Sequence, residues 1–272
     1  MNFQQIAWQK LAELNRLNDL STPPKQIYFM GKWNDEILEN CTAVVGSRRM
    51  TDYGRRVVEK IVPQLVAQNQ TIVSGFMYGV DQYAHQVCLE TGGKTIAVLG
   101  WGIDYKLTGY DLKLAKKIID YEGLLLSEWH TQAPTHWTFP SRNRIVAAMS
   151  QQVIVIEAAV NSGSLITARI AKNLKREVWA VPGPIFSRTS QGTNNLIALG
   201  KAKMYLGADT SSINLPANDP ILQALDQESL TTDEISRKLN LPVEEVGAQL
   251  SLLLLSGQIS EMGGKYYLND AS

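Results

Sequence analysis

Six short apolar runs alternate with longer mixed stretches between residues 42 and 183. The runs are TAVVG, TIVSG, TIAVLG, GLLLSE, QVIVIEA and EVWAVPG, and each is followed by a segment long enough for a helix. Strands that are apolar on both faces are typical of parallel sheets, because helical crossovers bury both faces. The pattern predicts an α/β fold with a Rossmann-like, doubly wound and mostly parallel sheet.

Two further segments flank this central region. Apolar residues recur at roughly helical spacing over residues 3–20, before the sequence Ser-Thr-Pro-Pro, and predict a short helical stub over 1–21. Asparagine, proline and aspartate around residues 214–220 indicate a linker. After the linker, three helical patterns and a hairpin turning on Gly263-Gly264 predict a small winged helix. We therefore predict three parts, at 1–21, 22–214 and 215–272.

The chain has no net charge, but its charge is unevenly distributed. Residues 216–272 contain nine acidic and three basic side chains, a net charge of −6, so residues 1–215 carry +6. A moderately basic body favours an anionic partner, whereas the acidic tail would repel one.

The sequence argues against several other kinds of site. Cys41 and Cys88 lack the close spacing of zinc or disulfide sites, and His85, His130 and His136 lie far apart without carboxylates at ligand spacing. We expect no metal and treat His85 as a structural helix residue. Without a basic N-terminal region or an apolar stretch of ~18 residues, we expect a cytoplasmic protein with reduced thiols and no membrane partner.

Three loops that follow predicted strands carry glycine and hydroxyl side chains. Ligands of open parallel sheets bind at the carboxyl ends of the strands, where these loops meet. Glycine permits tight turns, and hydroxyls and free helix amides favour an anion. Each loop could alternatively be only a capped strand-to-helix turn. Taken together, the loops predict a phosphate cradle formed by Gly46, Ser47, Arg48, Ser74, Gly75, Ser162, Gly163 and Ser164.

The stretch FPSRNRIVAAMS, residues 139–150, adds two arginines and an aromatic ring to this cradle. Residues two apart on a helix point to different sides, so we assign phosphate contact to Arg142, beside Asn143, and a bracing role to Arg144. The expected partner of Arg144 is Glu157 or Asp81, and internal salt bridges throughout the stretch are the alternative. Phe139 is a candidate for stacking on a base, with a hydrophobic staple as the equal alternative.

Neither a dinucleotide fingerprint nor a Walker motif is present. Gly46 and Gly54 do not satisfy GxGxxG, and Gly93-Lys94-Thr95 lacks the earlier glycine and leads into a strand. We therefore expect no cofactor and no catalytic residue.

An enzymatic alternative remains open. Glu157 near Ser164 and Thr167 suits a nucleotide sensor or a nucleoside-monophosphate phosphoribohydrolase, although Asp81 is the one further carboxylate in these loops.

Six blocks resemble the successive motifs of the DNA processing protein A family, also called Smf. The blocks are VVGSRR, SGFMYGVDQYAH, FPSRNRIVAAMS, IEAAVNSGSLITARIA, VWAVPG and GTNNLIALGKA, within residues 22–210. The resemblance implies a homodimer that binds single-stranded DNA without strong sequence preference, loads the RecA recombinase and serves natural transformation, or competence, and recombination. It also implies that Ser47, Arg48, Arg142 and Asn143 form the binding pocket.

This chain departs from the family pattern in three places. Its N-terminal segment is only a stub, Phe76-Met77-Tyr78 is bulkier than the usual Leu-Ala-Leu, and the segment after residue 104 lacks the usual Tyr-Pro.

The expected winged helix has the wrong charge for reading DNA. Its would-be recognition helix begins Pro242-Val243-Glu244-Glu245, where a reader helix offers basic or amide side chains. We expect Val243, Val246, Leu250 and Leu254 to pack within the domain and its acidic surface to contact a protein.

Overall fold

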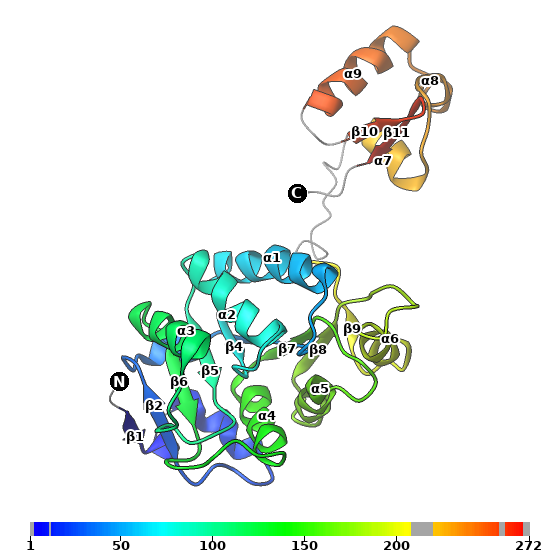
Figure 1. The fold of residues 1–272 in the computed structure, drawn as a ribbon. Helices are drawn as coiled ribbons and strands as arrows, with labels where there is room; N and C mark the ends of the chain where they lie inside the picture. The colour runs from blue at the N-terminus through cyan, green and yellow to red at the C-terminus, as the bar shows by residue number, and fades with distance from the viewer. Residues whose placement is uncertain (1–2, 11, 208–219, 256–258, 269–272) are drawn as a thin grey trace. The chain divides into compact units, whose positions relative to one another are not determined.

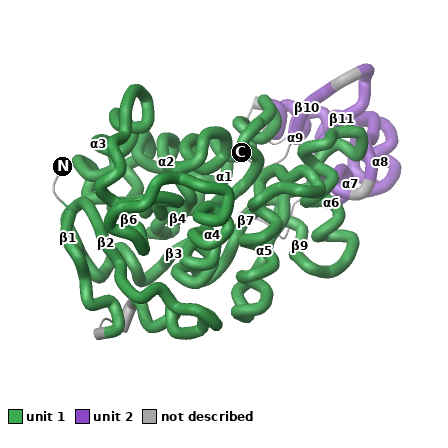
Figure 2. Tube along the Cα trace, turned by 60° about the horizontal axis from the view of Figure 1, so that its bottom comes forward, with its two compact units in different colours: residues 1–208 green, residues 209–272 purple. Residues whose placement is uncertain are grey.

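The computed structural model describes residues 3–10, 12–207, 220–255 and 259–268 (Figure 1). The chain forms two compact units, residues 1–208 and residues 209–272 (Figure 2). The predicted boundary between residues 214 and 215 lies outside the described residues.

The first unit is built on a nine-stranded sheet in the order β1-β2-β6-β5-β4-β3-β7-β8-β9. All six predicted strands are present and run parallel, which confirms the Rossmann-like, mostly parallel fold. Two antiparallel strands extend one edge and a short parallel strand extends the other. The strands are β1 (Gln4–Ile6), β2 (Ile27–Met30), β3 (Cys41–Val45), β4 (Thr71–Ser74), β5 (Thr95–Val98), β6 (Leu124–Ser127), β7 (Gln152–Val155), β8 (Glu177–Ala180) and β9 (Lys203–Met204).

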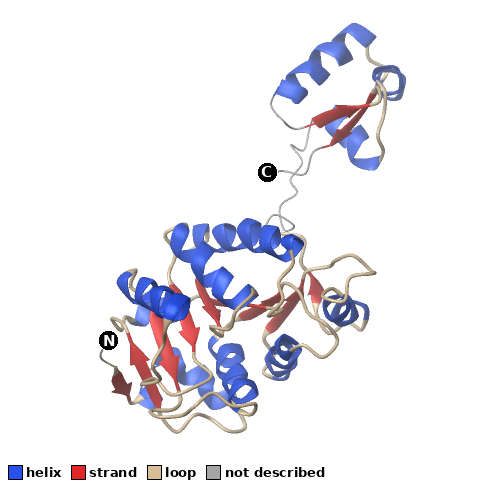
Figure 3. Cartoon of the chain, in the orientation of Figure 1, coloured by secondary structure: helices blue, strands red, loops and turns tan. Residues whose placement is uncertain are grey.

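Helices cover both faces of this sheet (Figure 3). Because successive strand residues point to opposite faces, Val44 of β3 packs in one hydrophobic cluster, with α1 and α2, while Ala43 and Val45 pack in another, with α4 and α5. The helices are α1 (Asp52–Ala67), α2 (Val80–Glu90), α3 (Gly109–Asp120), α4 (Thr138–Met149), α5 (Gly163–Asn173) and α6 (Gln191–Ala198). Burial on both faces explains why the central strands are apolar throughout.

The helical segment predicted over residues 3–20 is confirmed only in part. The segment forms strand β1 and two 3₁₀ helices, η1 (Trp8–Lys10) and η2 (Ala12–Asp19). Leu14, Leu17 and Leu20 recur at every third residue, which matches the three-residue turn of a 3₁₀ helix better than an α-helix. These leucines and Trp8 are buried in the cluster that contains α4 and α5, so the segment is part of the first unit.

The second unit has the three helices and hairpin of a winged helix, as predicted. The helices are α7 (Pro220–Gln227), α8 (Thr232–Leu239) and α9 (Val243–Leu255), followed by β10 (Ile259–Met262) and β11 (Lys265–Leu268). Gly263 and Gly264 have φ values of 64° and 78°, the left-handed region that a two-residue hairpin turn requires.

One packing prediction in α9 is wrong. Val246 and Leu250 are buried, but Val243 is 45% exposed. Leu241, which precedes the helix, packs against the core of the second unit instead. Glu244 and Glu245 are exposed, so the first turn of α9 presents two carboxylates to solvent.

Candidate functional site

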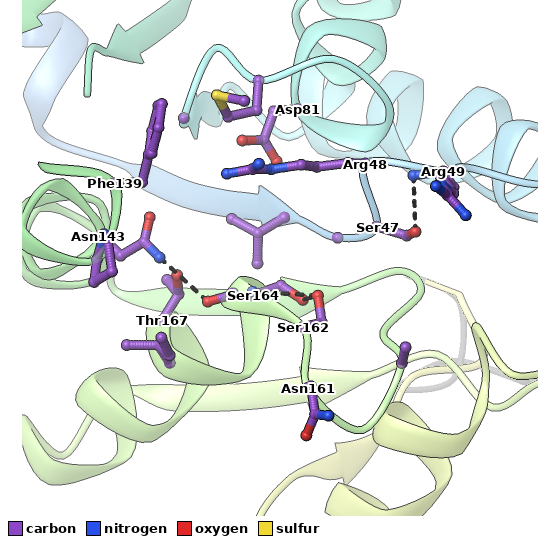
Figure 4. Close-up of a pocket in the computed structure, with 18 of the residues that line it drawn as sticks. Ser47, Arg48, Arg49, Asp81, Phe139, Asn143, Asn161, Ser162, Ser164 and Thr167 are labelled. Atoms are coloured by element: carbon purple, nitrogen blue, oxygen red, sulfur yellow. Dashed lines mark hydrogen bonds between the residues drawn. The ribbon is translucent and has the colours of Figure 1, made fainter. Parts of the chain in front are cut away.

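The strand order reverses at β3, which has β4 on one side and β7 on the other. The helices that follow these strands diverge to opposite faces at such a point and leave a crevice at the carboxyl edge. A pocket of about 750 Å³ lies there (Figure 4). Its walls come from five segments, at residues 45–49, 75–81, 136–146, 159–167 and 188–189.

Nearly all of the residues predicted to contact phosphate line this one pocket, and so does Phe139. The exception is Ser74, whose side chain is fully buried and donates to the carbonyl oxygen of Val44 at 2.6 Å. Ser74 is therefore corrected from a phosphate contact to a structural residue between β4 and β3.

Arg48 is an exposed cation of the pocket. It follows β3, and its guanidinium carbon lies 5.1 Å from the Phe139 ring centroid and 5.8 Å from that of Tyr78. The neighbouring hydroxyl of Ser47 accepts a hydrogen bond from the amide of Arg49 at 3.0 Å, which shapes the turn. Two aromatic rings thus orient a guanidinium group that keeps access to solvent.

Arg142 borders the pocket but is only 2% exposed. Its Nη1 donates to the carbonyl oxygens of Gly75 and Val98, and its Nε donates to Asn143 Oδ1 at 3.2 Å. A Cβ at Gly75 would overlap the guanidinium, so the glycine provides the space for it. The predicted phosphate contact of Arg142 is corrected, because these donors already bind the ends of β4 and β5.

Asp81 lies beneath the same pocket and is 9% exposed. Burial raises the pKa of its carboxyl, while the charge of Arg142 and hydrogen bonds from the Met77 and Gly46 amides lower it. Burial likewise lowers the pKa of Arg142 to about 10, against the attraction of Asp81. The opposite charges of the two groups therefore attract each other beneath the pocket.

Arg144 points away from Arg142, because residues two apart on a helix lie on different sides of it. Its partner is Glu128, which follows β6, and not Glu157 or Asp81 as predicted. Glu128 also accepts a hydrogen bond from the Ser141 hydroxyl at 3.2 Å.

Glu157 is 1% exposed and is bound within the fold. It accepts hydrogen bonds from the amide and hydroxyl of Thr51, at 2.9 and 2.6 Å, and from the Thr189 hydroxyl at 3.0 Å. Glu157 is absent from the pocket wall. The carboxylate on which the phosphoribohydrolase alternative depends is therefore a link between loops.

The start of α5 forms the opposite wall of the pocket. The hydroxyls of Ser162 and Ser164 lie 2.8 Å apart, and Asn143 Nδ2 donates to the carbonyl oxygen of Gly163 at 3.2 Å. Free amides and the positive end of the dipole at a helix N-terminus attract anions. Arg48 and this helix end therefore face the same space from two walls.

Sequence reasoning missed Arg188, which is exposed and lines the pocket together with Arg49. Arg188 lies in the loop after β8, the strand next to β7. The sequence could have indicated Arg188, because the loop that follows the strand run EVWAVPG also lies at the carboxyl edge of the sheet.

The described residues contain no group of three or more side chains suited to a metal ion. Burial raises the pKa of both cysteine thiols to about 12. Burial lowers the pKa of His85 to about 3, and its Nδ1 lies 2.7 Å from the Thr95 hydroxyl. Among the parts of the chain that the structure covers, no helix has the length and apolar character of a membrane span.

Two family models match the chain. The model of DNA recombination-mediator protein A matches residues 8–215, and that of the DprA winged helix domain matches residues 209–265. These matches confirm the resemblance seen in the sequence blocks.

Curated relatives show the same similarity. Protein Smf of Synechocystis is 35% identical over 85% of this chain and 59% of its own length, and Protein Smf of Escherichia coli is 34% identical over 82% and 66%. The DNA processing protein DprA of Streptococcus pneumoniae is 39% identical over 71% and 68%. The chain thus spans about six tenths to two thirds of the length of these relatives.

Two solved structures of DNA processing protein A are similar to this chain. That of Streptococcus pneumoniae DNA processing protein A has a TM-score of 0.67 and 36% identity, covering 77% of this chain and 73% of that one. A structure of the Helicobacter pylori protein, which describes its single-stranded DNA binding mode, has a TM-score of 0.68 and 28% identity, covering 76% and 92%.

Replacing Asp81 by asparagine should leave the buried Arg142 charge uncompensated. We expect the free energy of unfolding of the first unit to fall by roughly 3–5 kcal/mol. Urea titration followed by tryptophan fluorescence measures this unit alone, because all six tryptophans precede residue 180. The exposed Asp120→Asn variant is the control and should change stability by less than ~0.5 kcal/mol. Equal stability of the two variants would contradict a stabilising attraction between Asp81 and Arg142.

Proposed function

Because the chain belongs to the DNA recombination-mediator protein A family, we propose that it binds single-stranded DNA through the phosphates at the β3–β7 pocket. The observation that carries this proposal is the pairing of three exposed arginines, Arg48, Arg49 and Arg188, with the N-terminus of α5 around one pocket. Arginine side chains and free helix amides are both groups that proteins use to bind phosphate.

A single strand suits this pocket better than a duplex. Phe139 is half-buried in the pocket wall. Its ring packs edge-to-face on that of Trp101, with the centroids 6.3 Å apart, and it also contacts the guanidinium of Arg48. An unpaired base can stack on such a ring, whereas bases inside a duplex are already stacked. The similarity to the Helicobacter pylori protein supports the same preference.

We further propose that the pocket binds its ligand without chemical conversion. Within the described residues, the two buried carboxylates near the pocket are both engaged, Asp81 with Arg142 and Glu157 with two threonines. A general acid or base must reach the bond that reacts, and neither group is free to do so.

The wider role that we propose is in DNA recombination and natural transformation. In this role the cytoplasmic protein holds incoming single strands and helps to load RecA onto them. The similarity to the DNA processing proteins of Streptococcus pneumoniae and Bacillus subtilis supports this assignment.

The proposed homodimer has a suitable surface at the β9 edge of the sheet. Leu199 is 65% exposed, Met204 is 47% exposed and Leu206 is 61% exposed, all within one short segment. Exposed apolar side chains beside an edge strand are typical of an interface.

We expect Met204→Glu to shift the protein from dimer to monomer, because a carboxylate would have to be buried at the interface. Sedimentation velocity measures the mass directly. Tyr121→Glu is the matched control. Tyr121 is 52% exposed and precedes β6, which lies six positions from β9 in the strand order, so this variant should leave the dimer intact. A dimer that survives Met204→Glu would place the interface elsewhere.

Arg48→Ala should weaken binding on all single-stranded sequences alike. The loss of one phosphate contact should lower the slope of log affinity against log salt by about 0.7. Fluorescence anisotropy with single-stranded, duplex and mononucleotide ligands tests both the site and the proposed preference. Arg56→Ala, an exposed arginine of α1 outside the pocket, should bind like the parent protein. Normal binding by Arg48→Ala at moderate salt would remove Arg48 from the site.

Removing the second unit should leave affinity for single-stranded DNA intact or slightly raised. Residues 216–272 carry a net charge of −6, and Glu244 and Glu245 are exposed at the start of α9. These carboxylates repel DNA phosphates that lie within the Debye length, ~10 Å at 0.1 M salt. Binding isotherms of residues 1–216 and of the full chain at equal ionic strength measure the difference. A large drop in affinity with dimerisation preserved would mean that the second unit binds DNA.

A further inference from the structure

Two tryptophans lie together outside the pocket, in the segment between β6 and α4. Trp129 follows the end of β6, and Trp137 immediately precedes α4. Their ring centroids are 5.7 Å apart and their planes are perpendicular. Trp129 is half-buried, but Trp137 is 56% exposed, unlike the buried Trp8 and Trp101. We call Trp129 and Trp137 the tryptophan pair.

The pair lies between two hollows of the surface. On one side, His136 and Phe139 flank Trp137 in the sequence and line the phosphate pocket. On the other side, Trp129 lines a second hollow with Lys25, Tyr28 and His130. A chain of aromatic side chains therefore leads from the phosphate pocket toward the β6 side of the carboxyl edge.

The geometry of the pair leaves a ring face open. In a perpendicular contact the edge of one ring meets the face of the other, so the exposed ring keeps at least one face accessible. The partner ring also limits rotation of Trp137, which reduces the entropy lost when a planar ligand stacks on it. An exposed indole fixed in this way is suited to a nucleic acid base.

The surrounding charges permit a polyanion. Lys25 is exposed in the second hollow. Glu128 is also in its wall, but its carboxylate is bound to Arg144 and to the Ser141 hydroxyl. The negative charge of Glu128 is therefore compensated within the fold, and the exposed Asp104 accepts a hydrogen bond from the Thr131 hydroxyl at 2.8 Å.

We propose that the tryptophan pair is a second DNA subsite, in which Trp137 stacks on a base of the same strand whose phosphate occupies the pocket. The strand then leaves the pocket along the carboxyl edge, from β3 toward β6. This inference rests on the proposed function. The direct continuity of Trp137 with pocket residues on both sides in the sequence favours a DNA strand over a protein partner as the occupant.

The test compares two lengths of oligothymidylate on the full chain. A strand of about three nucleotides fills the pocket alone, whereas one of about twelve also reaches the pair. Trp137→Ala should weaken binding of the longer strand by roughly 5- to 150-fold and leave the shorter one unchanged. Trp137→Phe should retain most of the affinity but lose part of the tryptophan fluorescence quenching that the longer strand causes.

Tyr121→Ala is the matched control, because Tyr121 is 52% exposed but precedes β6 and so lies at the amino edge of the sheet. It should bind both strands normally, and thermal unfolding should be unchanged in all variants. Normal binding of the longer strand by Trp137→Ala would overturn the second subsite and leave the proposed function standing. Equal loss on both lengths would place Trp137 in the pocket itself and also overturn it. If the parent protein binds neither strand, the proposed function fails as well.

Discussion

The buried guanidinium of Arg142 determines how the pocket is built. It comes from α4, donates to the main-chain oxygens of Gly75 and Val98, and faces the carboxylate of Asp81 from α2. Removing such a charge from water is costly, and bound donors and a nearby counter-charge offset that cost. This requirement ties α4 and α2, which lie on opposite faces of the sheet, to the ends of β4 and β5.

This arrangement separates a structural cation from the cations that we propose bind DNA. Arg142 Nη1 donates to two carbonyl oxygens and Arg142 Nε donates to Asn143, while Arg144 pairs with Glu128, so both guanidinium groups are held within the fold. Arg48 carries the same charge on an exposed loop and is held by two aromatic rings. A cation whose donors are bound only to water can exchange that water for phosphate at little cost. A cation whose donors are hydrogen-bonded to carbonyl oxygens would first have to break those bonds.

The two units divide the chain by charge as well as by fold. The first unit concentrates arginine at the strand ends, while the second presents carboxylates at the start of α9. A winged helix is often a DNA reader, but this one offers the wrong charge in its first turn. The proposed division of tasks is DNA binding by the first unit and protein contact by the second.

The sequence by itself was sufficient to predict the parallel strands, the winged helix and most of the pocket wall. Runs such as QVIVIEA must be buried on both faces, and the loops after such strands must meet at one edge, so Gly46, Ser47, Arg48 and Ser162 could be placed together in advance. The roughly helical spacing of apolar residues over 3–20 predicted a helical stub but not its 3₁₀ form or the strand β1.

Only the tertiary structure decided which polar groups face the pocket. Arg48 and Arg142 are the same residue type in similar motifs, yet one is exposed and the other buried, because that depends on carbonyls and a carboxylate contributed by distant segments. The partner of Arg144 proved to be Glu128, and Arg188 entered the wall from a loop that sequence reasoning had left aside. Periodicity reports which face of an element is buried, but the pairing of charges depends on distances between elements far apart in the chain, and these exist only once the sheet order is set.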